Sequence, residues 1–442
     1  MAPAGSSSSG SEAISLEHLV QYLATTGQIQ EDVNQTLRTF GTKDTREVIL
    51  ASKLPSGQDP LELLNAQNNT LGYLYILSAR MSFPNTPPPS LPLIEAFCKD
   101  FNPEHARFAP DRVTALAKAM VQAAGENLKL ILEPLRDLAT RYPPTPSHLT
   151  TLHPIFLTAC VTTRHFATAL PILSSPIFNI DTSLSELSYN DNLIYHYAGG
   201  VAFGALKRWR EAEEFLEICV TAPGQIPAAI QLEALKKLTL VQLILYGKAT
   251  APPKYTNPTL IRILKNTPYH TLAKAYPQTI SSLTATISRD IDIFKAEQNL
   301  GLVQQVIQRA PRWLIRRLTL TYLTLGLGDI AKEVGIENEE EVRAVVVSMV
   351  ESEDINASIS VDGTVTFATS TAQFSKAEID KAVAQAQAQS QLLQELERTM
   401  NSSKEYLVKA IKHKDDAWGP DEDVMFNTHP GGSSWTDENL YS

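Results

Sequence analysis

Apolar and polar residues alternate along the segment 355–361, which is the clearest strand pattern in the chain. Its apolar members are Ile355, Ala357, Ile359 and Val361. The dipeptide Asp362-Gly363 follows, and residues 364–367 form a second short run with strand character. Alternation around Asp-Gly predicts a hairpin with a type I′ turn, because Asp and Gly tolerate the positive φ that this turn requires at both central residues.

Upstream of this hairpin, apolar residues recur at helical spacing. Asn338 can cap one helix, with Glu341 three residues later in a near capping box. The apolar face of this helix is Val342, Val345, Val346, Met349 and Val350. A shorter helix over 329–334 is expected to end at Gly335, which suits the left-handed residue after a helix.

A third helix is predicted to begin near Pro311, since proline fits the first turn of a helix. The residues that it would bury are Leu314, Leu318, Tyr322 and Leu325. Helices followed by a hairpin over 299–368 predict a winged-helix subdomain.

The helix that would have to enter a nucleic-acid groove is acidic. Between residues 338 and 354 the one base is Arg343. The acids in the same interval are Glu339, Glu340, Glu341, Glu351, Glu353 and Asp354. Nucleic-acid affinity depends on Lys and Arg that displace counterions, so phosphates would be repelled here. The pattern therefore favours protein assembly over nucleic-acid reading.

Basic residues stand on the preceding segment instead, namely Arg309, Arg312, Arg316 and Arg317. Arg312 and Arg316 are four apart and share a helix face, with Arg317 beside them, so we expect these three to be at least partly exposed. They could contact a phosphate or a protein partner. They could also form a solvated face that balances the acidic helix, which is the favoured interpretation because charge runs are usually solvated.

Helical patterns dominate from residue 13 to about residue 247, with proline-rich loops at 84–92 and 143–146. A faint repeat places Ala159, Phe166, Ala169 and Leu173 in register with Ala202, Trp209, Ala212 and Leu216, 43 residues later. Residues at tetratricopeptide spacing in the second copy are Tyr195, Gly199, Phe215 and Pro223. The pattern predicts a mainly α fold that begins with a helical-repeat solenoid, with chance spacing between ordinary antiparallel helices as the alternative.

A last long helix is predicted over 375–412, where Ser375 and Glu378 form a capping box. Its apolar seam consists of Ile379, Val383, Ala386, Leu393, Met400, Leu407 and Ile411. Such a seam is typical of a helix that packs on its own domain or on a partner helix. Low apolar content predicts disorder for residues 1–12 and for the acidic tail 414–442.

The composition of the chain disfavours several classes of protein. The chain has 442 residues and a formal net charge of −10, which allows two or three domains and disfavours a general binder of nucleic acid or anionic membranes. Its three cysteines, Cys98, Cys160 and Cys219, are widely spaced and indicate buried thiols in a reducing compartment. We expect neither secretion nor a membrane span, because no leader and no apolar run of about 20 residues is present.

The sequence contains no recognisable catalytic constellation and no phosphate-binding loop. His148 and His153 near Cys160 could suggest a metal site, but their spacing does not put them on one helical face. The pair Gly199-Gly200 follows no strand, so it indicates close helix packing. We therefore expect no enzyme activity, no cofactor, no metal and no small-molecule substrate.

Several blocks of sequence together carry a family resemblance. Two of them are Tyr195-His196-Tyr197-Ala198-Gly199-Gly200 and Leu232-Glu233-Ala234-Leu235-Lys236-Lys237, and the others lie at 243–248, 253–256, 301–303, 317–319 and 323–325. The set resembles the PCI-domain family of the proteasome lid, the COP-nine signalosome and a translation initiation factor. Within that family it is most similar to the branch of third signalosome subunits. Gly326 departs from the pattern, since the family tends to carry a Ser helix cap there.

The resemblance implies a non-catalytic scaffold in a complex that removes a ubiquitin-like modifier from cullins, in the cytoplasm and the nucleus. It implies as partners the other signalosome subunits, with PCI neighbours at the winged helix and all subunits in a bundle of C-terminal helices. The candidate interface residues are Arg312, Arg316, Arg317, Ile355, Ser358, Val361, Val365, Phe367, Ile379, Val383, Leu393, Met400, Leu407 and Ile411. The hairpin suits this role because an open strand edge offers unpaired backbone groups.

The expected domains are the helical repeats 13–192 and a PCI domain 193–368, with its helical part at 193–298 and its winged helix at 299–368. Another PCI assembly, either the proteasome lid or the initiation factor, is an alternative identity. A nucleic-acid-binding PCI protein of mRNA export is a second, which the acidic helix disfavours. An enzyme of unrecognised type is a third.

Overall fold

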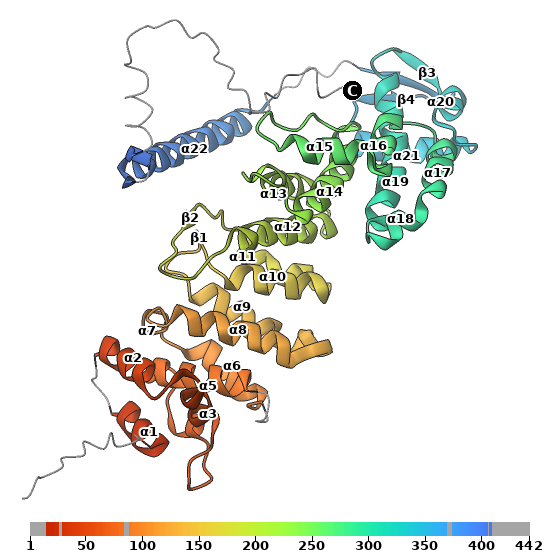
Figure 1. The fold of residues 1–442 in the computed structure, drawn as a ribbon. Helices are drawn as coiled ribbons and strands as arrows, with labels where there is room; N and C mark the ends of the chain where they lie inside the picture. Colours follow the sequence, from red (N-terminus) through yellow and green to blue (C-terminus); the bar gives the residue numbers. More distant parts are fainter. Residues whose placement is uncertain (1–14, 26–28, 84–87, 369–373, 405, 409–442) are drawn as a thin grey trace, which may run out of the picture. The chain divides into compact units, whose positions relative to one another are not determined.

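A computed structural model describes residues 15–25, 29–83, 88–368, 374–404 and 406–408 of the chain (Figure 1). The predicted mainly α fold is confirmed. The described residues up to Ala368 form one compact unit, and those from 374 onwards belong to a second. Residues 1–12 and 414–442, for which disorder is predicted, lie outside the described ranges. The seam residue Ile411 lies outside them as well.

The first compact unit begins with a stack of helices that follow one another in chain order (Figure 1). The early helices are α1 (Leu16–Ala24), α2 (Gln30–Thr39), α3 (Lys43–Ala51), α4 (Pro60–Leu63), α5 (Thr70–Ser82), α6 (Leu91–Asp100), α7 (Pro103–Ala106), α8 (Pro110–Ala124) and α9 (Leu132–Arg141). The next are α10 (Leu152–Thr162), α11 (Leu170–Leu173), α12 (Tyr189–Ala205), α13 (Trp209–Thr221) and α14 (Ala229–Tyr246). Two short strands, β1 (His148–Leu149) and β2 (Asn179–Ile180), pair in parallel beside this stack.

The 43-residue repeat of the sequence coincides with a repeated helix ending. Arg164 and Lys207 both have positive φ, of 60° and 59°. The N–H of the next residue donates to the carbonyl of Cys160 in the first copy and of Phe203 in the second, at 2.9 Å in both. These bonds are those of a Schellman-type helix end, so the repeat is a recurrence of backbone geometry and not of spacing alone.

Close helix packing explains Gly199-Gly200, as predicted. A Cβ at Gly199 would lie 2.6 Å from the ring of Phe215, and one at Gly200 would lie 2.7 Å from the Leu216 side chain. Both partners are on α13, so the two glycines allow α12 and α13 to approach closely.

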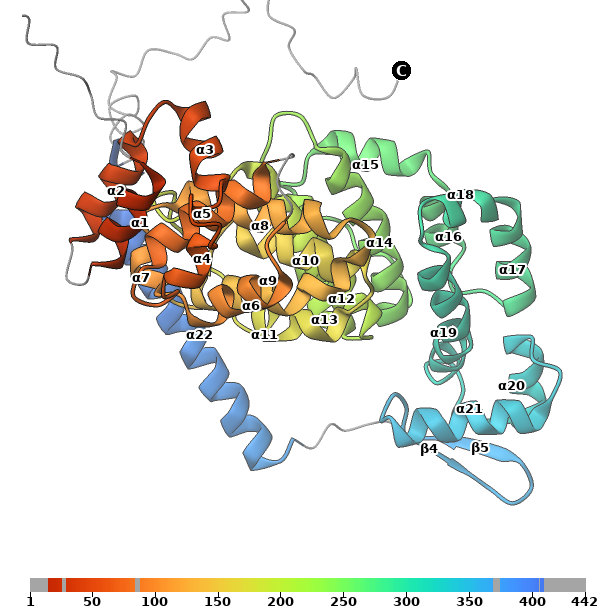
Figure 2. The same cartoon turned by 90° about the horizontal axis from the view of Figure 1, so that it is seen from below.

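Further along, the helices α15 (Pro258–Lys265), α16 (Pro268–Ala275), α17 (Ile280–Arg289) and α18 (Ile291–Ala296) lead to α19 (Leu300–Leu318). The winged helix is completed by β3 (Thr324–Gly326), α20 (Leu327–Val334), α21 (Glu339–Glu351), β4 (Ala357–Ile359) and β5 (Thr364–Phe367). The strands form an antiparallel sheet in the order β3-β5-β4. The sheet lies along α21 (Figure 2). As predicted, α20 ends at Gly335, whose φ is 76°.

The prediction of a helix beginning near Pro311 was wrong. The helix begins at Leu300, and Pro311 lies inside it. A proline within a helix removes one backbone hydrogen bond, and here burial on both halves of α19 compensates. Tyr322 is exposed and Leu325 belongs to β3, so neither continues the apolar stripe of this helix.

The turn of the hairpin also differs from the prediction. Only Gly363 has positive φ, at 82°, whereas a type I′ turn would need it at Asp362 as well. The N–H of Gly363 donates to the Ser360 carbonyl at 3.1 Å, and the Ser360 N–H donates to the Thr364 carbonyl at 2.8 Å. The connection is therefore a three-residue loop, a type I turn followed by a glycine bulge.

Two hydrophobic cores lie in the first compact unit, and α19 contributes to both. Val303, Val306 and Ala310 belong to the large core of the helical stack. Leu314, Ile315 and Leu318 belong to the smaller core of the winged helix. The helix α19 thus joins the two parts, and α17 adds to the junction through Ile280, which packs against the smaller core.

The last described helix, α22 (Lys376–Ser402), begins with the predicted capping box of Ser375 and Glu378. Its C-cap is Ser403, in an extended conformation, so this helix ends before residue 412. No residue of α22 is buried.

We predict that Gly199→Ala lowers the free energy of unfolding by about 1–3 kcal/mol, because the added methyl group overpacks the contact with Phe215. The matched control is Gly204→Ala on the same helix, where nothing lies within 4 Å of the added Cβ. That change should be neutral or slightly stabilising, since alanine favours helices more than glycine does. Denaturant unfolding of the two variants checks this, and equal effects would contradict the packing argument.

Candidate functional site

The hairpin of β4 and β5, called the wing below, carries predicted interface residues of two kinds, buried and exposed. Ile355, Val365 and Phe367 are buried in the winged-helix core, so their side chains hold the wing in place and are not available to a partner. Their place at the interface stays a prediction, which the burial of their side chains does not favour. Ser358 is exposed, and Val361 at the wing tip is fully exposed.

The backbone of β4 presents an open edge. The N–H of Ala368 donates to the Asn356 carbonyl and that of Ser360 to the Thr364 carbonyl, so residues 356, 358 and 360 direct their polar backbone groups towards β5. Ala357 and Ile359 lie between them and direct theirs away from the sheet. A proline at Ser358 would therefore break the β4–β5 ladder, and Ala357 is the better position for testing the edge.

Arg312 is part of a clamp inside the winged helix. Its guanidinium donates to Asp354 Oδ2 at 2.9 Å and to Ser352 Oγ at 3.2 Å, and it also bonds Ser348 Oγ. Arg309 reaches the same Asp354 oxygen at 3.3 Å. These contacts join α19 to the end of α21. The main role of Arg312 is therefore to stabilise the fold.

Arg316 and Arg317 are exposed, as expected, and neither forms an ion pair with another described residue. The Arg316 guanidinium lies 5.4 Å from the ring centroid of Trp313, a cation–π arrangement. These two cations are thus separate in role from Arg312.

The acidic character of α21 is concentrated at its start. Glu339, Glu340 and Glu341 form its first turn, which is where the helix dipole favours negative charge. Asn338 caps the helix by accepting from the Glu340 N–H at 3.0 Å. The exposed carboxylates make this surface unsuitable for phosphates.

The predicted seam of α22 is exposed along its described length. The large apolar members on α22 are Ile379, Val383, Leu393 and Met400, accessible from 49% at Val383 to 66% at Leu393. Leu407, 44% accessible, lies beyond the C-cap Ser403. Apolar side chains in a row along one helix are typical of a helix that needs a partner. Their role in assembly stays a prediction.

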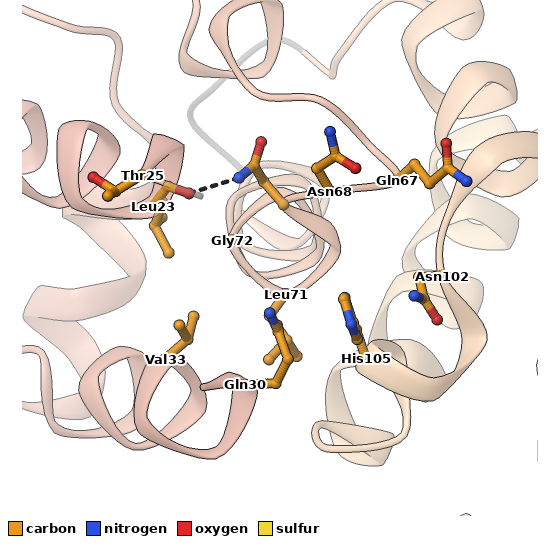
Figure 3. Close-up of a pocket in the computed structure, with 11 residues that line it drawn as sticks. Leu23, Thr25, Gln30, Val33, Gln67, Asn68, Leu71, Gly72, Asn102 and His105 are labelled. Carbon is orange, nitrogen blue, oxygen red and sulfur yellow. Dashed lines mark hydrogen bonds between the residues drawn. The ribbon is translucent and has the colours of Figure 1, made fainter. Parts of the chain in front are cut away.

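One cavity of about 500 Å³ lies near the start of the stack, between α1, α2, α5 and α7 (Figure 3). Side-chain amides dominate its lining, and two of them hold the local fold. Asn69 Nδ2 donates to the Leu23 carbonyl at 2.6 Å, and Asn102 caps α7. His105 alone adds a titratable group, and burial lowers its pKa. The Thr25 hydroxyl donates to the Gln21 carbonyl at 3.1 Å, and the described lining residues bring no pair of acid and base together.

The residues weighed as metal ligands have structural partners. His153 Nδ1 accepts from the Thr150 N–H at 3.0 Å, and burial lowers the pKa of His153 to about 4. His148 bonds Thr145 instead. Cys98, Cys160 and Cys219 are buried free thiols, as predicted, and burial raises the pKa of each. Within the described ranges, no three His, Cys, Asp or Glu side chains gather in a way that could hold a metal ion.

Two models of known protein families together match most of the residues of this chain. The model of the N-terminal helical repeats of COP9 signalosome complex subunit 3 matches residues 33–260, and the PCI-domain model matches residues 285–369. The chain belongs to the COP9 signalosome subunit 3 family. The predicted domain boundary at residue 193 is not tested by these matches and stays a prediction.

Two relatives in the subunit 3 family support the assignment over nearly the whole chain. COP9 signalosome complex subunit 3 of Dictyostelium discoideum is 30% identical over 70% of this chain and 75% of its own length. The Drosophila melanogaster protein of the same name is 28% identical over 91% of this chain and 97% of its own length. In the described part of the chain, no helix has the length and apolar character to span a membrane.

A buried polar network joins the parts matched by the two family models. Lys236 Nζ donates to Glu233 Oε1 and to Glu297 Oε1, both at 2.7 Å. Lys237 Nζ donates to Asn299 Oδ1 at 2.7 Å, and the Asn299 amide donates to the Tyr269 hydroxyl at 2.6 Å. The network thus links α14 to the start of α19.

Burial and hydrogen bonding to carboxylates shift the pKa of a lysine in opposite directions, and the two lysines differ in which effect prevails. Burial lowers the pKa of Lys237. For Lys236, burial acts in the same direction, but the hydrogen bonds that it donates to Glu233 and Glu297 outweigh burial and raise the pKa. Sequence reasoning used these lysines only as part of a family block. Adjacent lysines within the long apolar run of α14 were the available signal of a buried polar site.

We predict that Arg312→Ala lowers the free energy of unfolding by about 1–3 kcal/mol, since it leaves Asp354 without its closest charged partner. Hydrogen exchange of α21 amides should accelerate, because the clamp holds the end of that helix. Arg317→Ala is the control, and it should change stability by less than about 0.5 kcal/mol, as exposed substitutions usually do. An Arg312→Ala variant as stable as the control would refute the clamp.

Proposed function

We propose that this chain is a non-catalytic scaffold subunit of the COP9 signalosome, the complex that removes a ubiquitin-like modifier from cullin-RING ubiquitin ligases. The observation that carries the proposal is the winged helix, because its candidate recognition helix is acidic while its sheet leaves the edge of β4 open. The names of the relatives support the same role. The cytoplasm and the nucleus are the compartments that this role implies.

In this proposal the winged helix binds PCI-domain neighbours. The outward backbone groups of Ala357 and Ile359 would accept a strand or loop from the adjacent subunit. The exposed Ser358 and Val361 side chains lie next to that edge and would add contacts at its rim.

The helix α22 would supply the second contact, in a bundle with the C-terminal helices of the other subunits. Burying its apolar seam would contribute roughly 25 cal/mol for each Å² of apolar surface removed from water. The seam is exposed in the isolated chain, so the bundle would provide the apolar contacts that the rest of the chain does not make with it.

Catalysis, in this proposal, resides in another subunit. The side chains that could have formed a metal site here, those of His148 and His153, already serve local hydrogen bonds. The proposed role needs no cofactor, no nucleic acid and no membrane. Binding of RNA as in mRNA export is the alternative that the exposed Arg316 and Arg317 would favour, and the acidic start of α21 counts against it.

Mass spectrometry of partners that co-purify with the tagged, natively expressed chain tests the proposal. We expect the other signalosome subunits in near-equal amounts. Recovery of proteasome-lid or initiation-factor subunits in their place would contradict it.

We predict that Ala357→Pro weakens incorporation into the complex while the isolated chain keeps its helical content. Proline removes an outward N–H at a sheet edge, where it is tolerated. Ser358→Pro should instead disrupt the wing, since the Ser358 N–H faces β5. Co-purification and circular dichroism measure both effects. Full incorporation of folded Ala357→Pro, and of Ser358→Lys as a second edge variant, would exclude this edge as the contact.

We predict that removing residues 375–442 leaves a folded protein that incorporates poorly into the complex. Both hydrophobic cores end before this segment, so stability should not change. The control is the full-length chain with Asp380→Ala and Gln387→Ala, two substitutions outside the seam of α22. Normal assembly of the truncated chain would show that the seam has another role.

A further inference from the structure

A basic and aromatic pocket lies within the first compact unit, where α14 ends against α19. Its volume is about 520 Å³, and its principal lining residues are Tyr246, Lys248, Trp313, Arg316, Arg317 and Leu320. None of them belongs to the β4 edge or to α22. A volume within the usual range for ligand pockets, about 300–1,000 Å³, takes a few side chains of a peptide and not a folded domain.

One wall of the basic pocket is an indole ring held against backbone. A Cβ at Gly247 would lie 2.7 Å from Trp313 Cδ2, 2.9 Å from Cγ and 3.0 Å from Cε3. Similar distances to three bonded ring atoms place the Gly247 backbone against a face of the ring. The indole N–H donates to the Ile244 carbonyl at 3.3 Å, and the Arg316 guanidinium lies over the ring, 5.4 Å from its centroid. The fixed ring therefore orients Arg316 and keeps its donors available to a ligand.

The charge of the basic pocket is not neutralised within the described part of the chain. Lys248, Arg316 and Arg317 are exposed, and no ion pair forms between them and a described carboxylate. The Tyr246 hydroxyl already donates to Glu213, so this residue offers its ring to a ligand. A guanidinium binds a carboxylate through two parallel hydrogen bonds, and the two arginines therefore suit an acidic ligand.

Apolar side chains adjoin these cations in the loop that follows α19. Leu320, which lines the basic pocket, is 85% exposed, and Leu323 is 77% exposed. Tyr322 between them is exposed as well. Single exposed apolar residues are common, but three within four positions beside a cationic pocket are typical of a surface that binds a partner.

The pairing of cations with apolar groups favours a peptide over a nucleic acid. Nucleic-acid affinity grows with the number of phosphates that are contacted, and three cations provide few such contacts. Single-stranded nucleic acids also need aromatic faces on which bases stack, whereas Gly247 and Arg316 cover parts of the Trp313 ring. A nucleic acid would leave Leu320 in water, whereas an apolar peptide side chain would bury it.

We propose that the basic pocket binds an extended acidic peptide segment of another protein. Carboxylates of that segment contact Arg316, Arg317 and Lys248, and one large apolar side chain packs against Leu320 and the Tyr246 ring. The contact does not depend on membership of the signalosome, so the isolated full chain should bind such a peptide.

Fluorescence anisotropy with a labelled probe peptide tests the proposal. The probe has one Phe flanked on each side by two Glu, and two comparison peptides carry Gln in place of every Glu or Ser in place of the Phe. We expect saturable binding of the probe to the full chain and weaker binding of both comparison peptides. Added salt should weaken binding of the probe, because salt screens exposed charges.

Variants of the chain assign the binding to this pocket. Arg316→Glu/Arg317→Glu should weaken binding by about tenfold or more, which corresponds to about 1.4 kcal/mol. The matched control is Arg262→Glu/Lys274→Glu, with the same charge change at exposed positions outside the pocket, and it should bind as the wild type does. Circular dichroism checks that each variant is folded, and Arg316→Gln/Arg317→Gln is a milder second test of the same cations.

Two further measurements locate the peptide. Leu320→Ser should weaken binding of the probe but not of the peptide that lacks Phe, since it removes only apolar contact. Carbodiimide cross-linking, which joins a lysine amine to a carboxylate in direct contact, should link Lys248 to a Glu of the probe. Mass spectrometry identifies the linked lysine.

Three results would overturn the proposal. One is the absence of saturable binding, or equal binding by the two charge-reversed variants. Another is equal affinity for the peptides with Phe and with Ser, which would reduce the pocket to a non-specific cationic surface. The third is binding of a labelled single-stranded RNA that is tighter than that of the probe and lost in Arg316→Glu/Arg317→Glu.

Discussion

The fold depends on one helix that is buried in two cores at once. The first half of α19 packs into the helical stack through Val303 and Val306, and its second half packs into the winged helix through Leu314 and Ile315. Because the helix continues through Pro311, the two cores are joined by regular backbone and not by a loop. Two polar contacts fix it further, one from its N-cap Asn299 to Lys237 and one from Arg312, in its second half, to Asp354.

Local signals predicted local features well. The hairpin, the helix end at Gly335 and the capping box at Ser375 all depend on residues within a few positions of one another. The start of α19 could not be predicted in the same way, because burial against distant helices outweighs the local preference of Pro311. Strand β3 was missed for a similar reason, since its three residues become a strand only by pairing with β5.

The candidate site was predictable in outline but not in detail. Sequence spacing placed Arg312, Arg316 and Arg317 near one helix face, yet it could not show that Arg312 bonds Asp354, which lies 42 residues away. Alternation along 355–361 identified the strand, whereas the direction of each backbone amide depends on the register with β5. Likewise, the close approach of the Trp313 ring to the end of α14 requires Gly247, because a Cβ there would lie 2.7 Å from the ring.

The helix ends with left-handed residues show where this chain could be made more robust. Such a conformation disfavours any residue with a Cβ by roughly 1–2 kcal/mol. At Arg164 and Lys207 part of this conformational cost is offset, because a cation is favoured at the C-terminus of a helix. Gln298 and Glu353 have no such compensation, and both are exposed. Glycine at these two positions would relieve strain without touching a core, so they are the natural first sites for engineering a more heat-resistant form.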